Sequence, residues 1–466
     1  MKEQTQVSQS WRGVPVAILG FGVNNRALAR WLAKQGAQVT ICDQNEAVRE
    51  ADPETANEYS WQVGDAWLSD LGRFTYLFRT PGLRPDQPEI LAAVAAGSIL
   101  TSQTELFFAL CPAPIIGITG TKGKGTTSTL LAAMLRAGRE SAGFKDVWLA
   151  GNIGQDPFDF LDEITTDDVV ILELSSFQLM GARVHPKIAI LLRITADHQD
   201  YHQSMAEYVA AKSHLLREQT KDDIAILYGH GAHHPRFAQL TKATVYEYSR
   251  RRRVDRGVYL AGRGDDRALF MTGEGEPLLY AREMPLLGEH NLENVGAAAC
   301  AAHLLGVGRL SMRQALRAFT PLPHRLQIAF VDFSGVQFVD DAIATTPEST
   351  IASIRAFPRR RLHLIIGGVA KTDSYGELPK VIARRCQSVT LLGANSPTLT
   401  KLITSPEPWR AKTMEEAVRH ICRQVKPHDV VLLAPGAASF DLYPGYAAKG
   451  DDFAHRVRQY YLDHHV

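Results

Sequence analysis

The feature that most constrains this chain is a segment rich in glycine, lysine and threonine, Gly117-Ile118-Thr119-Gly120-Thr121-Lys122-Gly123-Lys124-Gly125-Thr126-Thr127. An apolar run at residues 114–118 leads into it, and a run with a helical pattern at residues 128–137 follows it. A strand, a tight turn and a helix are therefore expected in succession. Glycines let backbone N–H groups approach phosphate oxygens, while the helix N-terminus and a lysine supply positive charge. The segment indicates that the chain binds a nucleoside triphosphate.

Two positions of this segment depart from the phosphate-loop pattern G-x-x-x-x-G-K-[ST]. Ile118 stands where the first glycine is expected, and Gly125 stands where the pattern has a hydroxyl that ligates Mg²⁺. The nearest hydroxyl belongs to Thr126. Taken alone, the segment is also compatible with a glycine-rich turn that carries a surface lysine.

Length and composition place the chain among ordinary globular proteins and exclude several function classes. A length of 466 residues predicts about three domains. The net charge of +1 gives no electrostatic reason to expect nucleic-acid binding. The 5 cysteines are far apart and lack zinc-site spacing, which favours reduced thiols in a cytosolic protein. The N-terminus has no signal-peptide pattern, and no apolar run is long enough to span a membrane.

The order of apolar runs predicts an α/β fold with three segments. The first begins as a βαβ unit in which Gly20-Phe21-Gly22 follows a strand and Asp43 closes the next. This resembles a dinucleotide-binding turn, but Asn25 replaces the third glycine, so a plain tight turn explains it equally well. Strands of the second and third segments are expected at residues 169–174, 188–194, 224–228, 336–339, 362–366, 388–392 and 430–433.

Proline-rich breaks separate these segments. They are Cys111-Pro112-Ala113-Pro114 and Pro321-Leu322-Pro323. Domains are therefore predicted at residues 1–110, 111–322 and 323–466. Shorter strands with glycine-rich turns are expected at residues 258–271.

Charged groups at strand ends suggest where the chemistry lies. Glu173 ends a buried strand, and Asp197-His198 follows the next one, so both should face the crevice at the carboxyl edge of a parallel sheet. Carboxylate oxygens suit Mg²⁺. Lys212 lies in a helical stretch of small and apolar residues. Each residue also has a plainer explanation: a capping glutamate, an ordinary loop, and a lysine that reaches out to solvent.

Taken together, these motifs resemble the Mur ligase family. They occur in that family's order along the whole chain: Gly120-Thr121-Lys122-Gly123-Lys124, Gly151-Asn152-Ile153-Gly154, Glu173-Leu174-Ser175-Ser176-Phe177-Gln178, Asp197-His198 with Lys212, Gly288-Glu289-His290-Asn291-Leu292-Glu293-Asn294, and Leu322-Pro323-His324-Arg325. Ser439-Phe440-Asp441 resembles the members that add D-glutamate to UDP-N-acetylmuramoyl-L-alanine.

The resemblance implies three domains and an acyl-phosphate mechanism. A Rossmann-like N-terminal domain would bind the UDP-sugar, a central P-loop-type domain ATP, and a C-terminal dinucleotide-fold-like domain the amino acid. ATP would phosphorylate the substrate carboxylate, and the amine of glutamate would then displace phosphate. The partners would be UDP-N-acetylmuramoyl-L-alanine, glutamate and ATP, with Mg²⁺, for a cytoplasmic monomer that binds neither nucleic acid nor membrane.

The resemblance also implies residue roles. The residues for catalysis would be Lys124, Glu173, His198 and Lys212. Those for ATP would be Gly120, Thr121, Lys122, Gly123, Lys124, Gly125, Thr126, Thr127, Asn294, Arg325 and Asp341. Those for Mg²⁺ would be Thr126, Glu173, His198 and Lys212, which matches a lysine that is carbamylated in the family. Those for the UDP-sugar-peptide would be Val23, Asn24, Asp43, Thr80, Gly82, Asn152 and Ser175, and those for the amino acid Thr345, Lys371, Ser439 and Tyr446.

The departures from the family pattern gather in the C-terminal segment. Apart from Gly125, they are Ile343 where a lysine is usual, Val369 where an acidic residue is common, and Ala437 where a cysteine is usual. An acceptor such as L-glutamate therefore remains an alternative, and Gly125 also suggests a non-catalytic nucleotide-binding relative. A folylpolyglutamate synthase is disfavoured because such enzymes lack the N-terminal UDP domain that the first βαβ unit predicts. An oxidoreductase would be supported by Gly20-Phe21-Gly22 alone.

Overall fold

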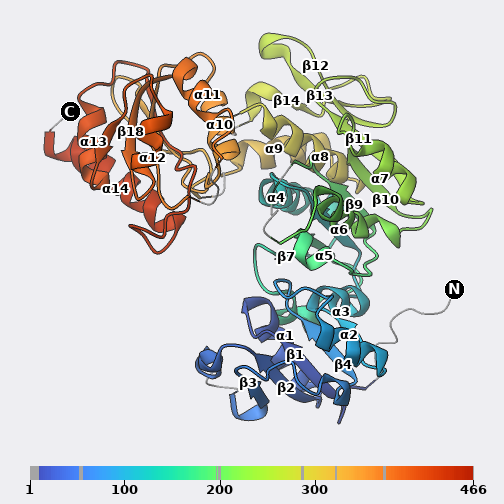
Figure 1. Cartoon of the computed structure of the whole chain (residues 1–466). Helices are drawn as coiled ribbons and strands as arrows, with labels where there is room; N and C mark the ends of the chain where they lie inside the picture. Colours follow the sequence, from blue (N-terminus) through green and yellow to red (C-terminus); the bar gives the residue numbers. More distant parts are fainter. Residues whose placement is uncertain are drawn as a thin grey trace. The chain divides into compact units, whose positions relative to one another are not determined.

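The computed structural model describes residues 10–51, 56–195, 197, 201–284, 288–320, 323–370 and 374–464. It contains three β-sheets flanked by helices (Figure 1), which confirms the predicted α/β class. The chain forms two compact units. The first comprises Met1–Glu283 and Glu293–Ala318, and the second comprises Met284–Leu292 and Phe319–Val466.

The first sheet is parallel, with strand order β3-β2-β1-β4-β5. Its strands are β1 (Pro15–Leu19), β2 (Gln38–Asp43), β3 (Ser60–Val63), β4 (Tyr76–Arg79) and β5 (Ile99–Thr101), and its helices are α1 (Val23–Lys34), α2 (Pro88–Ala95) and α3 (Gln103–Leu110). The strand order reverses between β1 and β4. Loops at such a point diverge and leave a crevice that binds ligands in open α/β sheets.

The second sheet has strand order β14-β13-β12-β11-β10-β9-β6-β8-β7. Its strands are β6 (Ile115–Thr119), β7 (Val147–Gly151), β8 (Val169–Glu173), β9 (Ile188–Leu191), β10 (Ile224–Tyr228), β11 (Thr244–Ser249), β12 (Gly257–Ala261), β13 (Ala268–Met271) and β14 (Leu279–Tyr280). Its helices are α4 (Lys124–Ala142), α5 (Ser176–Leu179), α6 (Met205–Arg217), α7 (His234–Leu240), α8 (His290–Leu304) and α9 (Arg309–Ala318). The short strands expected at residues 258–271 are the antiparallel pair β12 and β13.

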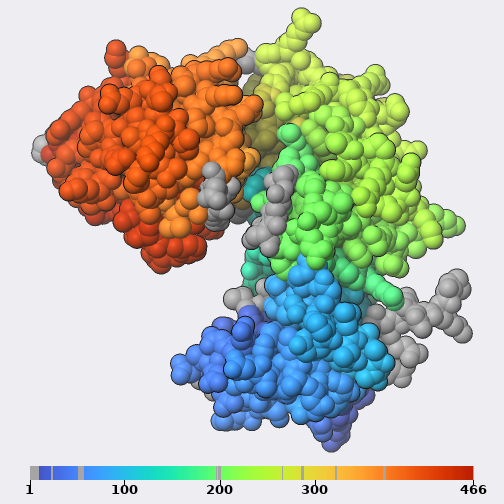
Figure 2. Space-filling view, in the orientation of Figure 1, coloured from blue at the N-terminus to red at the C-terminus, as the bar shows by residue number. Residues whose placement is uncertain are grey.

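One apolar cluster joins the first two sheets. It runs from β1 and helices α1 and α3 to Phe158, Phe160 and strand β8. The ring of Trp31 lies edge-on to Phe158, with ring centroids 5.4 Å apart. Atoms of the two parts meet closely in Figure 2, where the N-terminal residues are blue and the central ones blue-green to green. This shared core explains why both sheets belong to one compact unit, because burial of apolar surface is the main stabilising term.

The third sheet has strand order β15-β16-β20-β17-β18-β19 and is parallel except for β15. Its strands are β15 (Gln327–Val331), β16 (Gln337–Asp340), β17 (Leu362–Ile366), β18 (Cys386–Leu392), β19 (Trp409–Ala411) and β20 (Val430–Leu433). Its helices are α10 (Pro347–Arg355), α11 (Leu378–Arg385), α12 (Ser396–Leu402), α13 (Met414–Cys422) and α14 (Tyr446–His464).

Alternating side chains of this sheet build two cores. Leu362, Leu364 and Ile366 of β17 pack with α10, α11 and α12 on one face. Ile365 between them packs with α13 and α14 on the other. Because successive strand residues point to opposite faces, a continuous apolar strand predicts a sheet covered on both sides.

Most predicted strands match within two residues, but two boundaries differ. Helix α4 begins at Lys124 rather than residue 128, so the lysine lies in the first helical turn. Strand β9 ends at Leu191, three residues before the predicted end. Among the described residues, no helix is both long enough and apolar enough to cross a lipid bilayer.

Candidate active site

The phosphate-loop segment connects β6 to the N-terminus of α4. Gly123 precedes the helix with a φ of +90°, which side chains disfavour, and no side chain caps the helix there. A β-carbon on Gly123 would lie 2.2 Å from Oδ1 of Asn294, so any larger residue there would displace the Asn294 side chain. An uncapped helix N-terminus with a lysine in its first turn suits a phosphate group. The residues present therefore fit the predicted nucleotide.

Thr121 ties this loop to the end of β9. Its hydroxyl accepts a hydrogen bond from the Thr195 N–H and donates one to the Thr195 carbonyl, both at 3.0 Å. The hydroxyl of Tyr208 donates to the Thr121 oxygen at 3.1 Å. The side chain of Thr121 thus holds the loop in place, a contribution that the sequence motif does not reveal.

Lys212 lies directly beneath the loop because α6 packs against β6. A β-carbon on Gly117 would meet Cδ1 of Leu215 at 2.6 Å, so this glycine permits the close approach of the helix. Lys212 lies three residues earlier, on the same face of α6. Its Nζ donates to the carbonyl of Gly120 at 2.9 Å and lies 4.7 Å from the ring centroid of Tyr208.

The environment of Lys212 disfavours the charged form of its amine. Its side chain is almost completely buried, and burial lowers the pKa of its ammonium well below the usual value. The nearby charge of Lys124 lowers this pKa further, while Asp197 and Glu173 oppose the shift. A neutral amine is a nucleophile, so the site suits reaction of Lys212 with CO₂.

Glu173 ends β8 between β6 and β7. It pairs with Ile118 on one side and Gly151 on the other, and it is 4% exposed. Gly151 has a φ of +100°, and a β-carbon there would lie 2.2 Å from the Glu173 carbonyl oxygen. The N–H of Asn152 donates to that same carbonyl at 3.0 Å. The glycine turn therefore places the backbone of Asn152 against the end of β8.

A cavity of about 400 Å³ brings five of the predicted residues together. They come from three loops and two helices, and they are Gly82, Lys124, Asn152, Ser175 and Lys212. The remaining wall consists of Pro81, Ser176, Phe177 and Tyr208. Ser175 also begins α5, where its hydroxyl accepts from the Gln178 N–H at 3.2 Å. Substrate contact by Ser175 would have to be shared with this cap.

At the end of the first sheet, Asp43 and Thr80 surround the loop that follows β1. The Asp43 carboxylate accepts from the N–H groups of Phe21 and Asn45, at 2.7 and 2.8 Å. A β-carbon on Gly20 would meet Cγ2 of Thr80 at 2.5 Å. Asn25, the residue in place of the third glycine, donates from its side-chain amide to the Gly20 carbonyl at 2.9 Å. Val23 and Asn24 begin α1, and their side chains lie outside the described part.

The predicted nucleotide and amino-acid residues of the second compact unit differ in burial and in the elements that carry them. Asp341 is buried, and its carboxylate accepts from the Leu326 N–H at 3.0 Å and from the Ser353 hydroxyl. Burial raises its pKa to about 6. Arg325 precedes β15, Thr345 precedes α10, and Tyr446 begins α14 with its side chain exposed.

Ser439 is buried, and its hydroxyl has no hydrogen-bond partner among the residues that the structure describes. A buried polar atom of this kind costs free energy unless a ligand supplies its partner. Ser439 therefore fits the predicted contact to an amino-acid substrate.

Two predicted residues, His198 and Lys371, lie outside the described residues. Within the described part, no group of three histidine, cysteine, aspartate or glutamate side chains could hold a metal. The oxygens of Glu173 and Thr126 are buried beside the loop and suit Mg²⁺. Lys122 is exposed, and its Nζ pairs with Asp197 at 3.2 Å.

Sequence patterns alone did not reveal several residues of the site. Tyr208 and Pro81 line the cavity but belong to none of the quoted motifs, and Phe177 lies within one of them without a predicted role. Tyr208 lies four residues before Lys212 in α6 and therefore on the same face of the helix. This spacing was the available sequence signal that Tyr208 lies beside Lys212.

Comparisons with known proteins agree with this geometry. Three family profiles match, described as "Mur ligase MurD-like, N-terminal domain" over residues 15–102, "Mur ligase middle domain" over residues 118–302 and "Mur ligase, glutamate ligase domain" over residues 324–436. The UDP-N-acetylmuramoylalanine–D-glutamate ligase of Acetivibrio thermocellus is 35% identical over 452 residues, covering 94% of this chain and 95% of the relative. The chain belongs to the Mur ligase family.

Further Mur ligases are similar to this chain. The UDP-N-acetylmuramoylalanine–D-glutamate ligase of Symbiobacterium thermophilum is 34% identical, covering 94% of this chain and 96% of the relative. The crystal structure of a UDP-N-acetylmuramate-alanine ligase from Thermotoga maritima has a TM-score of 0.59 at 18% identity, covering 96% of this chain and 99% of that one. The predicted three-domain Mur ligase architecture is confirmed. As a Mur ligase, the chain is an ATP-dependent enzyme that forms an amide bond in peptidoglycan precursor synthesis.

Proposed function

We propose that this Mur ligase adds D-glutamate to UDP-N-acetylmuramoyl-L-alanine at the expense of ATP. The names of relatives that align along nearly the whole chain support this choice of substrates. The observation that carries the proposal is the cavity, because it joins the phosphate loop to residues predicted for the sugar-peptide. A reaction between ATP and a substrate carboxylate requires these two groups in one place.

Lys124 and the N-terminus of α4 act on the phosphate groups. A carboxylate is a weak electrophile, and its oxygen leaves poorly, so it is first converted to an acyl phosphate with release of ADP. The amine of glutamate then attacks the acyl carbon, and inorganic phosphate leaves as the amide forms. Positive charge at the phosphate loop stabilises the charge on the transferred group. Asn294, Arg325 and Asp341 are proposed to contact the nucleotide.

Glu173, Thr126, His198 and a carbamylated Lys212 would hold Mg²⁺. A bound Mg²⁺ would neutralise phosphate charge. Carbamylation of the neutral Lys212 amine gives a negatively charged group like a carboxylate, whereas the protonated amine would repel the metal. If Thr126 supplies the hydroxyl that Gly125 lacks, Thr126→Val should sharply raise the Mg²⁺ concentration needed for activity, whereas Gly125→Ser should be tolerated. A Thr126→Val protein with the parent's Mg²⁺ requirement would exclude that role.

The three domains are proposed at residues 1–110 for the UDP-sugar, 111–322 for ATP and 323–466 for the amino acid. In the last domain, Lys371 would pair with one carboxylate of glutamate. The hydroxyls of Thr345 and Ser439, with Tyr446, would surround the rest. We further propose a cytoplasmic monomer that binds neither nucleic acid nor membrane.

The decisive test offers D- and L-glutamate separately with UDP-N-acetylmuramoyl-L-alanine and ATP. Phosphate release and the chirality of the product are measured. Product from D-glutamate alone is expected. Product from L-glutamate alone would replace the acceptor but keep the ligase, and no product from either, with no phosphate release, would exclude the proposed activity.

A further inference from the structure

Two arginines of the first sheet cross to the second sheet beside the cavity. Arg79 ends β4, and Arg84 lies five residues later, on the loop that also carries Gly82. Their partners lie in α5 and the residue that follows it, in α6, and at Tyr201 just before α6. Neither arginine belongs to the motifs discussed above.

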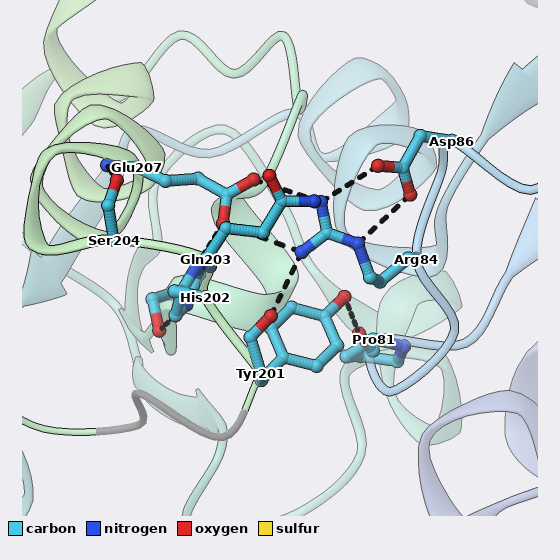
Figure 3. Close-up of polar contacts among 9 residues, drawn as sticks. Pro81, Arg84, Asp86, Tyr201, His202, Gln203, Ser204 and Glu207 are labelled. Carbon is cyan, nitrogen blue, oxygen red and sulfur yellow. Dashed lines mark hydrogen bonds and ion pairs between the residues drawn. The ribbon is translucent and has the colours of Figure 1, made fainter.

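Arg84 makes a charged cluster with Asp86, Tyr201 and Glu207 (Figure 3). Its Nη2 lies 2.8 Å from Asp86 of its own loop and 2.9 Å from Glu207 of α6. Its Nη1 donates to the Tyr201 carbonyl at 2.9 Å. The guanidinium is 19% exposed, which makes these contacts stronger than those of a fully solvated pair. The hydrogen bond from Arg84 lowers the pKa of Glu207.

The same cluster reaches the cavity wall at two points. The hydroxyl of Tyr201 donates to the carbonyl of Pro81 at 3.1 Å (Figure 3). The buried His202 links Glu207 to the cavity, because its Nδ1 lies 3.7 Å from the Glu207 carboxylate and its Nε2 lies 2.9 Å from the hydroxyl of Ser176. Pro81 and Ser176 both line the cavity. The cluster is therefore connected to the walls that the two sheets contribute.

Arg79 adds a second connection in the same place. It is buried, and its Nη1 donates to the carbonyls of Thr80, Pro81 and Leu83, at 3.3, 3.2 and 2.5 Å. Its Nη2 donates to the carbonyl of Met180 at 3.1 Å, at the end of α5. Arg79 therefore anchors the loop after β4 on its buried side, and Arg84 anchors it on the side nearer to solvent.

We propose that Arg84 is a positioning residue for the UDP-sugar-peptide substrate. It holds the loop carrying Gly82 against α6, the helix that carries Lys212. This contact sets the spacing between the sugar-binding loop and the phosphate loop. The inference rests on the proposed function and extends it with a residue that lies outside the cavity.

A second ion pair between the two sheets, more exposed than that of Arg84, serves as a control for this inference. Lys34 of α1 pairs with Asp162 of the central part at 2.8 Å, so it also joins the two sheets by an ion pair. Both side chains are exposed, and neither lines the cavity. If loss of any ion pair between the sheets impairs the enzyme, the variant Lys34→Met must behave like Arg84→Met.

The experiment uses the full chain with the variants Arg84→Met, Arg84→Lys, Glu207→Gln, Arg84→Met with Glu207→Gln, and Lys34→Met. Calorimetry measures binding of UDP-N-acetylmuramoyl-L-alanine, and phosphate release gives KM values for that substrate and for ATP. Arg84→Met should raise the Kd and KM of the UDP-sugar-peptide about tenfold, the scale of a charged hydrogen bond. The KM for ATP should change less than about twofold. Circular dichroism checks that each variant is folded.

The conservative and double variants separate positioning from a general structural role. Arg84→Lys keeps the charge but loses the fork geometry, so it should restore part of the binding. The double variant should bind the UDP-sugar-peptide no more weakly than Arg84→Met, because both single changes remove the same contact between Arg84 and Glu207. Lys34→Met should stay within about twofold of wild type. Should Arg84→Met not fold, Arg84→Lys and Glu207→Gln carry the same test.

Equal effects of Lys34→Met and Arg84→Met on substrate binding would overturn the inference. Equal rises in the KM for ATP and the KM for the UDP-sugar-peptide would do the same, as would unchanged binding in every Arg84 variant. These results leave the proposed function intact. Failure of the wild-type protein to bind UDP-N-acetylmuramoyl-L-alanine would instead remove the proposed function, and the inference with it.

Discussion

The side-chain oxygen of Asn294 lies 2.2 Å from the position that a β-carbon on Gly123 would occupy. Asn294 of α8 therefore fills the space beside the residue that precedes α4. Gly123→Ala is therefore expected to displace Asn294 and to strain the loop, since a φ of +90° costs an alanine about 1–2 kcal/mol. Turnover should fall by about tenfold or more, as measured by phosphate release.

Truncation of the neighbour tests the origin of that loss. In Gly123→Ala with Asn294→Ala, the clash is absent and only the backbone strain remains. The double variant should fold more stably than Gly123→Ala alone. If it is equally unstable, the contact between these two residues does not matter.

Lys124→Ala should abolish turnover while the fold is retained. Lys124 lies in the first turn of α4, and its ammonium donates to the carbonyls of Gly120 and Thr121 at 3.3 Å. Its removal takes charge from the transferring phosphoryl group, which typically costs about 100-fold or more. Lys145→Ala, an exposed position after the same helix, is the control and should remain active. Turnover in Lys124→Ala equal to the control would reduce the loop to a structural turn.

Lys212 should carry a carbamate. Incubation with ¹³C-bicarbonate should give one protein carbamate signal by NMR, and this signal should be absent in Lys212→Ala. Lys449 is a second buried lysine, with a pKa lowered to about 8 by burial, and it tests selectivity. A signal that persists in Lys212→Ala but disappears in Lys449→Met would place the carbamate on Lys449 and contradict its assignment to Lys212. Lys212→Ala should also be inactive, with partial rescue by small carboxylates.

Ser439→Ala should weaken glutamate binding without loss of stability. The buried hydroxyl has no partner among the described residues, so its removal relieves a desolvation cost of about 1–3 kcal/mol. Thermal unfolding should occur at the same or a higher temperature, while the KM for glutamate rises. A lowered unfolding temperature with an unchanged KM would point to a structural hydroxyl instead.

Asp341 should make stability depend on pH. Burial raises its pKa from 3.8 to about 6, so between these values the folded protein holds a proton that the unfolded chain releases. Stability from this group is greatest below pH 3.8 and decreases as pH rises through 6, by about 3 kcal/mol in all. Asp341→Asn cannot lose a proton. Its unfolding temperature should therefore rise relative to wild type between pH 4 and pH 7, and a constant difference would contradict this role.

Local patterns predicted the elements that carry the site. Strand β6, the loop and α4 follow from apolar residues, glycines and a lysine that are adjacent in sequence. Glu173 at the end of β8 was recognisable because a buried apolar run ends in a carboxylate. The fold class and the family were predictable for the same reason, since the motifs keep their order along the chain.

Tertiary structure decided which side chains share a cavity and which hold it in shape. Arg84 and Glu207 are separated by 123 residues, and nothing in either segment marks the other as its partner. Thr121 reads as a phosphate contact in the motif, yet its hydroxyl is bonded to Thr195. The spacing of apolar residues predicts which face of a helix or strand is buried, because this face is set by residues that are close together in the sequence. Contacts between sheets depend on how those faces pack together, and only the folded structure determines that.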